Sequence, residues 1–473
     1  MAVSEITELW RMSATELGEM IRSRQVSCQE VIEEHLRRIE AVNGSINAVV
    51  IILAEQALET AKTADRAVAA GSDLGPFHGV PFTVKENIDV TGTPTTQGFK
   101  ALANAYPSRD APVVERLKAA GGIPIGRTNL PSGAIRWHCE SELWGATVNP
   151  WNSSRTPGAS SAGEAAAIAT GMSPLGLGND GLGSLRHPAQ CCGVSALKPT
   201  LGRIPQASTV GAPEIATIGM QLTQVNGPLA RRVADLRGAL EIIAGPTWRD
   251  PWTVPAPLRG PEPAKPTRVA IVLDPAGLGT AKQVQDGVRK AAHALDQAGY
   301  VVDEVEPPSI EAAAKALVVM YATPGIRAIW QQVMPPSLPT PTRRFMSEFF
   351  EAAGDPDAVA AEQSFITRQS LLRSWSEFQG HHPLIVAPIA TDIPAEAGTD
   401  LDEGRVAEDL RTMRMAIAVN ALGLPAVALP VGIGDGLPQA VQVIGPRYRE
   451  DICLDAAAAI ENRVGIITPI DPR

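Results

Sequence analysis

The chain has 473 residues, 44% of them hydrophobic and 19% charged, which is the composition of a globular protein and excludes a disordered one. Its net charge of −10 and the lack of a long basic run argue against nucleic acid or an anionic membrane as the main partner. The first residues show no basic start followed by an apolar run, and the apolar run at 49–54 is too short to cross a bilayer.

Five cysteines are present, an odd number without metal-ligand spacing, and we interpret them as reduced thiols of the core. Cys191 and Cys192 are adjacent in sequence and therefore poorly placed to pair with each other. With no secretory signal visible, we expect a cytoplasmic protein that needs no metal ion or other cofactor.

Residues 13–69 are predicted to form three helices. Ser13 with Glu16 and Ser27 with Glu30 each match a capping box, in which the serine binds an orphan amide and the glutamate reaches back to the helix start. The apolar residues that follow Ser27 have a helical period, which gives that helix one face to bury. These helices are expected to serve as scaffold.

Segment 79–90, GVPFTVKENIDV, has the β-branched and aromatic residues of a buried strand, yet Lys85 lies in its middle. A lysine is almost never buried without a partner. Lys85 therefore either pairs with a neighbouring acid, Glu86 or Asp89, or has a chemical role.

The stretch 156–188 is rich in glycine and in small hydroxyl residues and holds only two acidic side chains, Glu164 and Asp180. Glycine reaches backbone conformations closed to other residues, so such a stretch lets backbone come close to backbone or to a ligand. Its serines are candidates for chemistry. In the loop before it, Trp137 and Trp144 either line a pocket or fill the core.

The remaining patterns favour an α/β fold. Residues 268–306 indicate a strand, a helix and a second strand, with a turn at Gly299. Residues 309–380 are helical in pattern and are expected to form either a lid or cap region or a plain peripheral layer. Short strands are also expected at 122–126, 384–389, 426–432 and 440–445, and a closing helix at 451–462.

Gly176, Gly178 and Gly181 match the glycine pattern of a dinucleotide-binding loop. That pattern should open a helix and be followed about 20 residues later by an acidic residue that holds the ribose. Here Pro188 interrupts soon afterwards, and no Asp or Glu occurs between 182 and 213. The sequence therefore argues against a nucleotide site.

A serine hydrolase with a histidine base is also weakly supported. No serine of the stretch stands in a GxSxG frame, and of the seven histidines His187, three residues after Ser184, is the best placed. Adjacent His381 and His382 lack the spacing of a zinc pair. Lysine remains as a base, because an apolar setting desolvates its charged form, and this returns attention to Lys85.

A resemblance to a known family rests on seven segments: GVPFTVKENIDVTGTPTT (79–96), NPWNSSRTPGASSAGEAAAIA (149–169), SPLGLGNDGLGSLRHPA (173–189), CGVSALKPTLGR (192–203), GPLARRVADL (227–236), GLPAVALPVG (423–432) and GLPQAVQVIGP (436–446). In them the chain resembles the amidase signature hydrolases, over about residues 10–465. The resemblance implies an α/β/α sandwich with a large mixed central β-sheet flanked by helices on both faces. It further implies a single domain over 1–473, with the catalytic core at 70–205.

The resemblance also implies a triad of serine, cis-serine and lysine. By motif the nucleophile is Ser184, the bridging serine is Ser160 and the base is Lys85. The peptide bond between Ala159 and Ser160 is expected to be cis. The oxyanion hole is expected from the backbone amides that lead to the nucleophile, Gly181, Leu182 and Gly183, with Ser184 itself.

Two departures from the family pattern lie close to this triad. The usual GGSSGG is GASSAG here, with Ala159 at the cis bond, and TDIGGS is NDGLGS, with Asn179 in place of threonine and Leu182 at the hole. Neither departure removes a catalytic atom. By analogy with the family, the acyl chain of the substrate is expected to lie beside Ala134, Ile135 and Trp137.

The implied activity is hydrolysis of an aryl or alkyl carboxylic amide, a small molecule, through a serine acyl-enzyme. Carbamates and esters are alternative substrates, because the same acyl-enzyme serves them. The A subunit of glutamyl-tRNA amidotransferase is a less favoured alternative, since the segment after Lys85 differs from what that subunit usually shows. The intact Lys85, Ser160 and Ser184 argue against a catalytically silent binding protein. A homodimer remains open.

Overall fold

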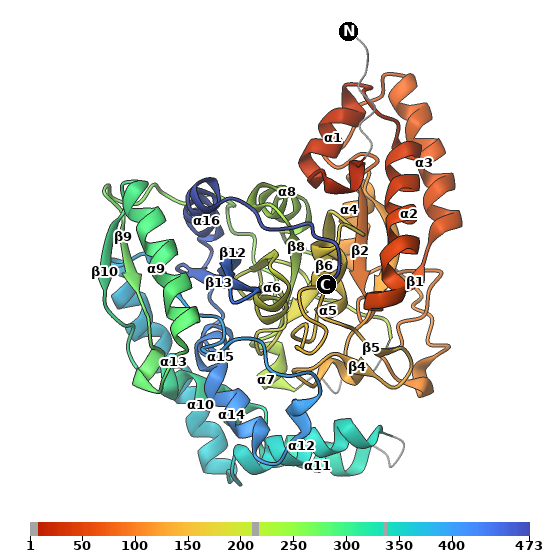
Figure 1. The fold of residues 1–473 in the computed structure, drawn as a ribbon. Coiled ribbons are helices and arrows are strands. Elements are labelled where there is room, and N and C mark those ends of the chain that lie inside the picture. Colours follow the sequence, from red (N-terminus) through yellow and green to blue (C-terminus); the bar gives the residue numbers. More distant parts are fainter. Residues whose placement is uncertain (1–7, 211–216, 334–337) are drawn as a thin grey trace.

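The computed structural model describes residues 8–210, 217–333 and 338–473. Within these residues one mixed sheet of 11 strands lies at the centre, with helices packed around it (Figure 1). The predicted fold class is confirmed. In sheet order the strands are β1 (Val49–Ile52), β3 (Ile123–Thr128), β2 (Pro81–Lys85), β6 (Leu175–Asp180), β8 (Val225–Ala230), β7 (Ser195–Lys198), β12 (Ala426–Gly434), β13 (Leu437–Ile444), β11 (Leu384–Ala387), β9 (Arg268–Ile271) and β10 (Val301–Glu304).

A second, two-stranded sheet is formed by β4 (Glu140–Ser141) and β5 (Gly145–Ala146). The α-helices of the described residues are α1 (Ala14–Arg22), α2 (Cys28–Ile46), α3 (Ala54–Ala69), α4 (Pro112–Ala119), α5 (Ala162–Ala169), α6 (Arg186–Cys192), α7 (Ile218–Gln221), α8 (Val233–Ile243), α9 (Lys282–Gln297), α10 (Ile310–Met320), α11 (Pro324–Val333), α12 (Thr340–Ala352), α13 (Ala358–His381), α14 (Arg405–Thr412), α15 (Arg414–Ala421) and α16 (Glu450–Val464). None of them is long and apolar enough to cross a membrane.

The N-terminal helices begin where the sequence signals placed them. Ser13 and Ser27 each accept a hydrogen bond from the amide three residues later, and Glu16 and Glu30 accept one from the amide of the respective serine. Both predicted capping boxes are therefore confirmed. The five cysteines are buried and unpaired, as expected of core thiols.

Strand β2 runs parallel to both of its neighbours, β3 and β6, and all five of its residues are buried. The carboxyl ends of parallel strands meet at one edge of a sheet, where ligand sites of α/β folds lie. Lys85 ends β2 and Asp180 ends β6. The two most specific sequence segments therefore converge at the same edge.

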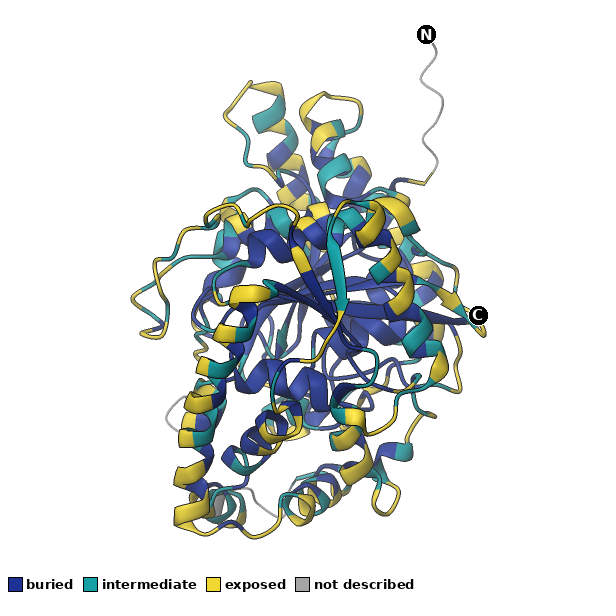
Figure 2. Cartoon of the chain, turned by 90° about the vertical axis from the view of Figure 1, so that its left-hand side faces the viewer, coloured by how far each residue is buried: buried dark blue, intermediate teal, exposed yellow. Residues whose placement is uncertain are grey.

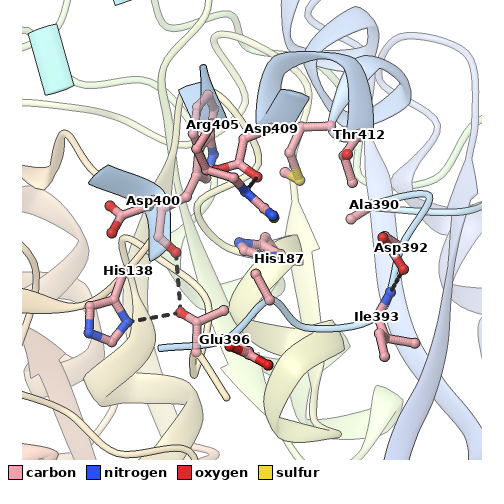
Figure 3. A pocket seen from close by; sticks show the side chains of 14 residues that line it. His138, His187, Ala390, Asp392, Ile393, Glu396, Asp400, Arg405, Asp409 and Thr412 are labelled. Atoms are coloured by element: carbon pink, nitrogen blue, oxygen red, sulfur yellow. Dashed lines mark hydrogen bonds and ion pairs between the residues drawn. The ribbon is translucent and has the colours of Figure 1, made fainter. Parts of the chain in front are cut away.

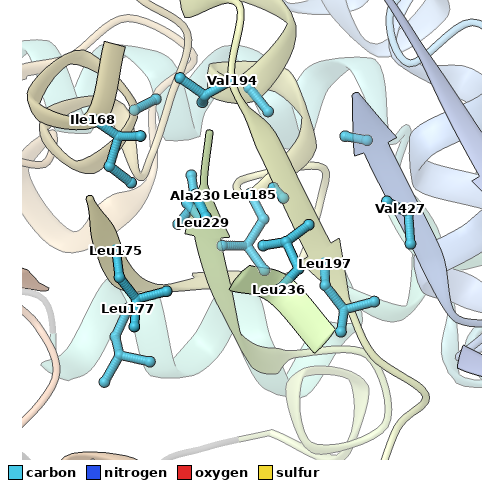
Figure 4. Close-up of a cluster of buried hydrophobic side chains, with 14 of the residues drawn as sticks. Ile168, Leu175, Leu177, Leu185, Val194, Leu197, Leu229, Ala230, Leu236 and Val427 are labelled. Atoms are coloured by element: carbon cyan, nitrogen blue, oxygen red, sulfur yellow. The ribbon is translucent and has the colours of Figure 1, made fainter. Parts of the chain in front are cut away.

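A layer of buried leucines supports this edge from within the sheet (Figure 4). Leu177 of β6, Leu197 of β7 and Leu229 of β8 are buried, and Leu185, directly after Ser184, is buried with them. Fully burying a leucine side chain stabilises the fold by about 2 kcal/mol. Leu185 thus fixes the backbone next to the candidate nucleophile.

The second half of the chain follows the predicted order. The expected strand, helix and strand over 268–306 are β9, α9 and β10, and the two strands pair in parallel. The expected apolar strands at 384–389, 426–432 and 440–445 are β11, β12 and β13, and the closing helix is α16. Strands of the two halves join where β12 pairs antiparallel with β7.

The region 309–380 is helical, as predicted, and consists of α10 to α13, with positions 334–337 outside the described residues. These helices carry many exposed residues, unlike the buried strands of the sheet (Figure 2). The ring of Phe345 in α12 packs edge-on against Trp137, with 5.4 Å between ring centroids. Whether this region acts as a lid stays a prediction.

Candidate active site

Lys85 is held at the centre of the site by two side chains from the glycine-rich stretch. Its Nζ lies 2.6 Å from Ser160 Oγ and 2.6 Å from Asn179 Oδ1. The alternative pairing with a neighbouring acid is wrong, because Glu86 accepts a hydrogen bond from the Thr96 amide instead and Asp89 Oδ2 binds residues 208 and 209. Lys85 thus reaches across to a serine hydroxyl rather than along its own segment.

The surroundings of Lys85 favour its neutral form. Burial lowers the pKa of Lys85 to about 7, although acidic neighbours such as Asp180 counteract part of the effect. Burial likewise raises the pKa of Glu164 to about 8. Above pH 7 an unprotonated amine is therefore available at Lys85, as a general base requires.

Glu164 connects the helix after the paired serines to the strands beside Lys85. It accepts hydrogen bonds from Thr83 Oγ1 of β2 and Thr128 Oγ1 of β3, each at 2.7 Å. A Cβ at Gly176 would overlap its carboxylate, so the glycine at this position of β6 lets strand and side chain approach closely. Glu164 therefore fixes α5, and with it the serines that precede α5, against the sheet.

Ser160 and Ser184 are placed next to each other through their backbones. The peptide bond between Ala159 and Ser160 is cis, as expected, and the amide of Ser161 donates to the carbonyl of Ser184 at 3.1 Å. Ser160 is buried, whereas Ser184 is partly exposed and so accessible to a substrate. The hydrogen bonds of the described residues do not include one between the two hydroxyls.

The loop that carries Ser184 is organised by Asp180. Its carboxylate accepts hydrogen bonds from the amides of Gly183, at 2.8 Å, and Leu185, at 3.1 Å. The Gly183 amide, expected as a donor of the oxyanion hole, is therefore directed at Asp180. In the described part of the chain the remaining expected donors have no acceptor: the amides of Gly181, Leu182 and Ser184.

A buried ion pair holds Asp180 in turn. Burial alone would raise the pKa of Asp180, but the Arg186 guanidinium, 3.0 Å away, keeps this pKa well below its usual range. Arg186 also donates to Asn420 Oδ1 and Gln442 Oε1, which lie on α15 and β13. The loop is thereby tied to the C-terminal half of the sheet.

Asn179 and Asp180 are further candidate site residues that motif reasoning did not assign. Asn179 binds Lys85 through Oδ1, and its Nδ2 donates to Asn87 Oδ1 at 2.9 Å. The available signal for Asp180 was its place as one of only two acidic residues in the stretch 156–188. The signal for Asn179 was its departure from the family's threonine.

A pocket lies beside this centre, and its lining includes Trp137, His138, His187 and side chains of the segment 390–413. Figure 3 shows His187 in the middle, with His138 and Asp400 on one side and Asp392 and Ile393 on the other. Of the three residues expected beside the substrate, Trp137 lines this pocket. Ala134 and Ile135 do not line it, and both are partly exposed. Trp137 therefore both packs in the core and lines a pocket.

His187 does not have the contacts of a general base for Ser184. Burial lowers the pKa of His187 to about 4, although the backbone carbonyl of Ala159 counteracts part of this effect. None of the hydrogen bonds found among the described residues joins its ring to Ser184. Lysine remains the side chain with the geometry of a base.

The fold and the buried contact between lysine and serine are those expected of an amide-cleaving hydrolase. The sequence model of one family, described as Amidase, matches residues 30–454, and the chain belongs to the amidase family. This confirms the resemblance that the sequence motifs indicated.

Individual relatives extend over almost the whole chain. An indoleacetamide hydrolase of Bradyrhizobium diazoefficiens is 39% identical over 476 residues, covering 97% of this chain and 88% of the relative. The A subunit of a glutamyl-tRNA(Gln) amidotransferase from Moorella thermoacetica is 31% identical over 483 residues, covering 96% of this chain and 97% of the relative. The solved structure of 6-aminohexanoate cyclic dimer hydrolase complexed with substrate matches with a TM-score of 0.82 at 28% identity, covering 98% of this chain and 99% of that one.

Proposed function

We propose that this protein hydrolyses small carboxylic amides, and arylacetamides such as indole-3-acetamide in particular, through an acyl-enzyme at Ser184. The observation that carries the proposal is the buried Lys85 Nζ at 2.6 Å from Ser160 Oγ, beside the loop of Ser184. The choice of arylacetamides is supported by the 39% identity to an indoleacetamide hydrolase. The products are the carboxylic acid and ammonia.

In the acylation step Lys85 acts as general base through Ser160. Neutral Lys85 takes the proton of Ser160, Ser160 takes the proton of Ser184, and Ser184 Oγ bonds to the amide carbon. The proton held by Lys85 then passes back through Ser160 to the nitrogen as the carbon–nitrogen bond breaks. Ammonia leaves, and the acyl group remains as an ester on Ser184.

Deacylation repeats these transfers with water as the nucleophile. Water attacks the ester carbon and gives its proton to Ser184 as the carbon–oxygen bond breaks, and the triad returns to its starting state. In both steps negative charge develops on the carbonyl oxygen. The amides of Gly181, Leu182 and Ser184 are the donors without another acceptor among the described residues, and they stabilise this charge in the proposed mechanism.

The proposal is tested by a substrate panel that separates the alternative leaving groups. Release of ammonia from indole-3-acetamide and phenylacetamide is compared with hydrolysis of an anilide, an aryl carbamate and an aryl ester of matched acyl part. We expect the highest kcat/KM among amides for the primary arylacetamides. Preference for the carbamate would instead assign the protein to the alternative class that uses the same acyl-enzyme.

A second candidate is the A subunit of an amidotransferase, which the 31% identity to such a protein favours. L-glutamine is therefore included in the panel, alone and with proteins co-purified from the source cell. Glutamine hydrolysis that requires a co-purified partner protein and exceeds arylacetamide hydrolysis would replace the proposed function by this one.

A further inference from the structure

His187 holds an unused hydrogen-bond acceptor inside the pocket next to Ser184. Its imidazole is more than nine-tenths buried, and Nδ1 has no partner among the described residues. Figure 3 shows the ring at the centre of the pocket, with Arg405 and Asp409 on one side and Glu396 on the other. A buried polar atom without a partner destabilises the empty pocket, so an occupant that donates a hydrogen bond to it binds more tightly.

The tautomer of His187 follows from its other contact. We assign the ring proton to Nε2, because Nδ1 has no partner among the described residues and the Ala159 carbonyl favours a donor on the ring. Burial lowers the pKa of His187 to about 4, and the charge of Arg405 acts in the same direction, so the ring is neutral at pH 7. Nδ1 therefore carries a lone pair and can only accept.

Several other polar side chains of the pocket already have partners within the protein. His138 Nδ1 contacts Thr156 Oγ1 at 3.3 Å, and Asp400 accepts two hydrogen bonds from Arg136, each at 2.9 Å. The third such pair joins the Arg405 guanidinium to Asp409 at 2.8 Å. Of the buried side-chain atoms that line the described pocket, His187 Nδ1 is the one without a partner.

Part of the wall around this acceptor is apolar. Trp137, Met413 and Ile393 contribute aromatic and aliphatic surface to the lining, and polar or charged side chains make up most of the rest. A ligand pocket commonly combines apolar surface, which packs against a ring, with a few placed polar atoms, which fix the orientation of that ring.

The pocket borders the turn of chain that carries Ser184. The His187 amide donates to the Gly183 carbonyl at 2.7 Å, so His187 and Ser184 belong to one turn of the chain. Met413, which lines the pocket, packs with its Cε against Gly183. The pocket and the loop of Ser184 are therefore in contact through Met413.

We propose that His187 Nδ1 accepts a hydrogen bond from a ring N–H of the substrate's acyl group and thereby selects N–H heteroaryl acetamides over analogues without that donor. This inference rests on the proposed function and assigns the substrate class of the same site. In indole-3-acetamide the donor is the indole N–H. A ring that places oxygen at that position leaves Nδ1 facing another acceptor.

The test compares indole-3-acetamide with benzofuran-3-acetamide, which has nearly the same shape but no ring N–H. For the wild-type protein we expect kcat/KM to be about 10-fold or more higher with the indole, the usual consequence of leaving a buried partner unpaired. His187→Leu should reduce this ratio to about twofold or less. His138→Leu is the matched control, because it removes an imidazole of the same pocket whose Nδ1 is already engaged, and it should keep the wild-type ratio.

The ratio of kcat/KM for the indole substrate to that for the benzofuran substrate separates recognition from damage to the fold. A distorted site lowers kcat/KM for both substrates together and leaves their ratio unchanged. His187→Gln, which restores an acceptor, should recover part of the preference for indole. Equal kcat/KM for the two substrates in the wild type, or a ratio unchanged by His187→Leu, overturns the assignment of His187 and leaves the proposed function standing. Failure of the wild type to hydrolyse either amide overturns the proposed function, and this inference with it.

Discussion

Two buried lysines of the same sheet differ in the contact that the proposed mechanism requires of its base. Lys85 ends β2 and Lys198 ends β7, both are fully buried, and burial lowers the pKa of each to about 7. Lys85 contacts the hydroxyl of Ser160, whereas Lys198 donates to the backbone carbonyls of Leu424, at 2.7 Å, and Pro199, at 3.2 Å. A hydroxyl can give a proton to a neutral amine, and a carbonyl cannot.

The comparison teaches that a lowered pKa alone does not identify a catalytic group. Perturbed pKa values gather at functional sites, but buried structural groups show them as well. Lys198 joins the end of β7 to the chain before β12 and has no hydroxyl partner among the described residues, so it fits a structural role. Two features distinguish the site of Lys85 from that of Lys198: the hydroxyl of Ser160 as hydrogen-bond partner, and the partly exposed Ser184 nearby.

The largest effect is expected from substitution of Ser184, the proposed nucleophile, which lies near Lys85 and has no counterpart at Lys198. Ser184→Ala removes the atom that bonds to the acyl group, so kcat/KM for arylacetamides should fall by about 10⁵-fold. Ammonia release measures this, and an unchanged thermal unfolding temperature shows that the fold is retained. The control is Ser161→Ala, which removes the hydroxyl adjacent to Ser160 that binds the Asn179 carbonyl, and it should keep at least about a tenth of the activity. Wild-type turnover in Ser184→Ala would exclude this serine as the nucleophile.

The same substitution at each lysine tests the comparison directly. Lys85→Met should lower kcat by about 10³-fold, the contribution of a general base, with little change in substrate affinity measured by titration calorimetry. Lys198→Met should change kcat by about fivefold or less, because its partners are backbone carbonyls. Equal losses in the two variants would contradict the rule that the hydroxyl partner makes the base.

A smaller effect is expected from Asn179, a positioning residue for Lys85. The wild type should lose kcat/KM as pH falls through about 7, because the base must be neutral and Lys85 has a pKa of about 7. Asn179→Asp places a carboxylate beside Lys85 Nζ, which favours the charged amine. The acid limb of the kcat/KM profile, where activity falls with falling pH, should therefore move to higher pH by about one unit. Asn179→Leu removes the acceptor without adding charge and should not move the limb upward. The kcat/KM profile between pH 5.5 and 9.5 measures all three proteins, and an unshifted limb in Asn179→Asp would argue that Lys85 is not the titrating base.

Much of the reaction centre could be predicted from sequence because it is built from short segments with a fixed spacing. Lys85 lies 75 residues before Ser160 in the chain, and their contact at 2.6 Å follows from two motifs alone. The helix starts at Ser13 and Ser27 depend on contacts three residues apart, which sequence also displays. Local signals and family motifs therefore locate the strands, the helix starts and the lysine.

The rest depends on contacts that no local pattern encodes. Arg186 stabilises Asp180 from six residues away, but its bond to Gln442 joins positions 256 residues apart. The pocket draws ten of its 14 lining residues from 390–413, where the sequence shows no motif of chemistry. His187 stood out in the sequence for its distance from Ser184, and its free Nδ1 appears only once the ring is placed among the described residues.

The smallest expected effect is on the pH dependence of the free energy of unfolding, which tests the protonation of the two lysines apart from catalysis. Between pH 7 and 10 an unfolded lysine holds a proton that the buried one lacks, so the unfolded state binds more protons and the free energy of unfolding rises with pH. Each lysine contributes about 1.4 kcal/mol per pH unit to this slope. Lys198→Met and Lys85→Met should each reduce the slope by that amount in urea unfolding between pH 8 and 9.5. A slope unaffected by Lys198→Met would mean that Lys198 is charged in the folded protein, and the two lysines would then differ in protonation as well as in partner. Equal reductions in slope, with unequal losses of kcat, would show that burial sets the pKa of both lysines while Ser160 alone makes one of them a base.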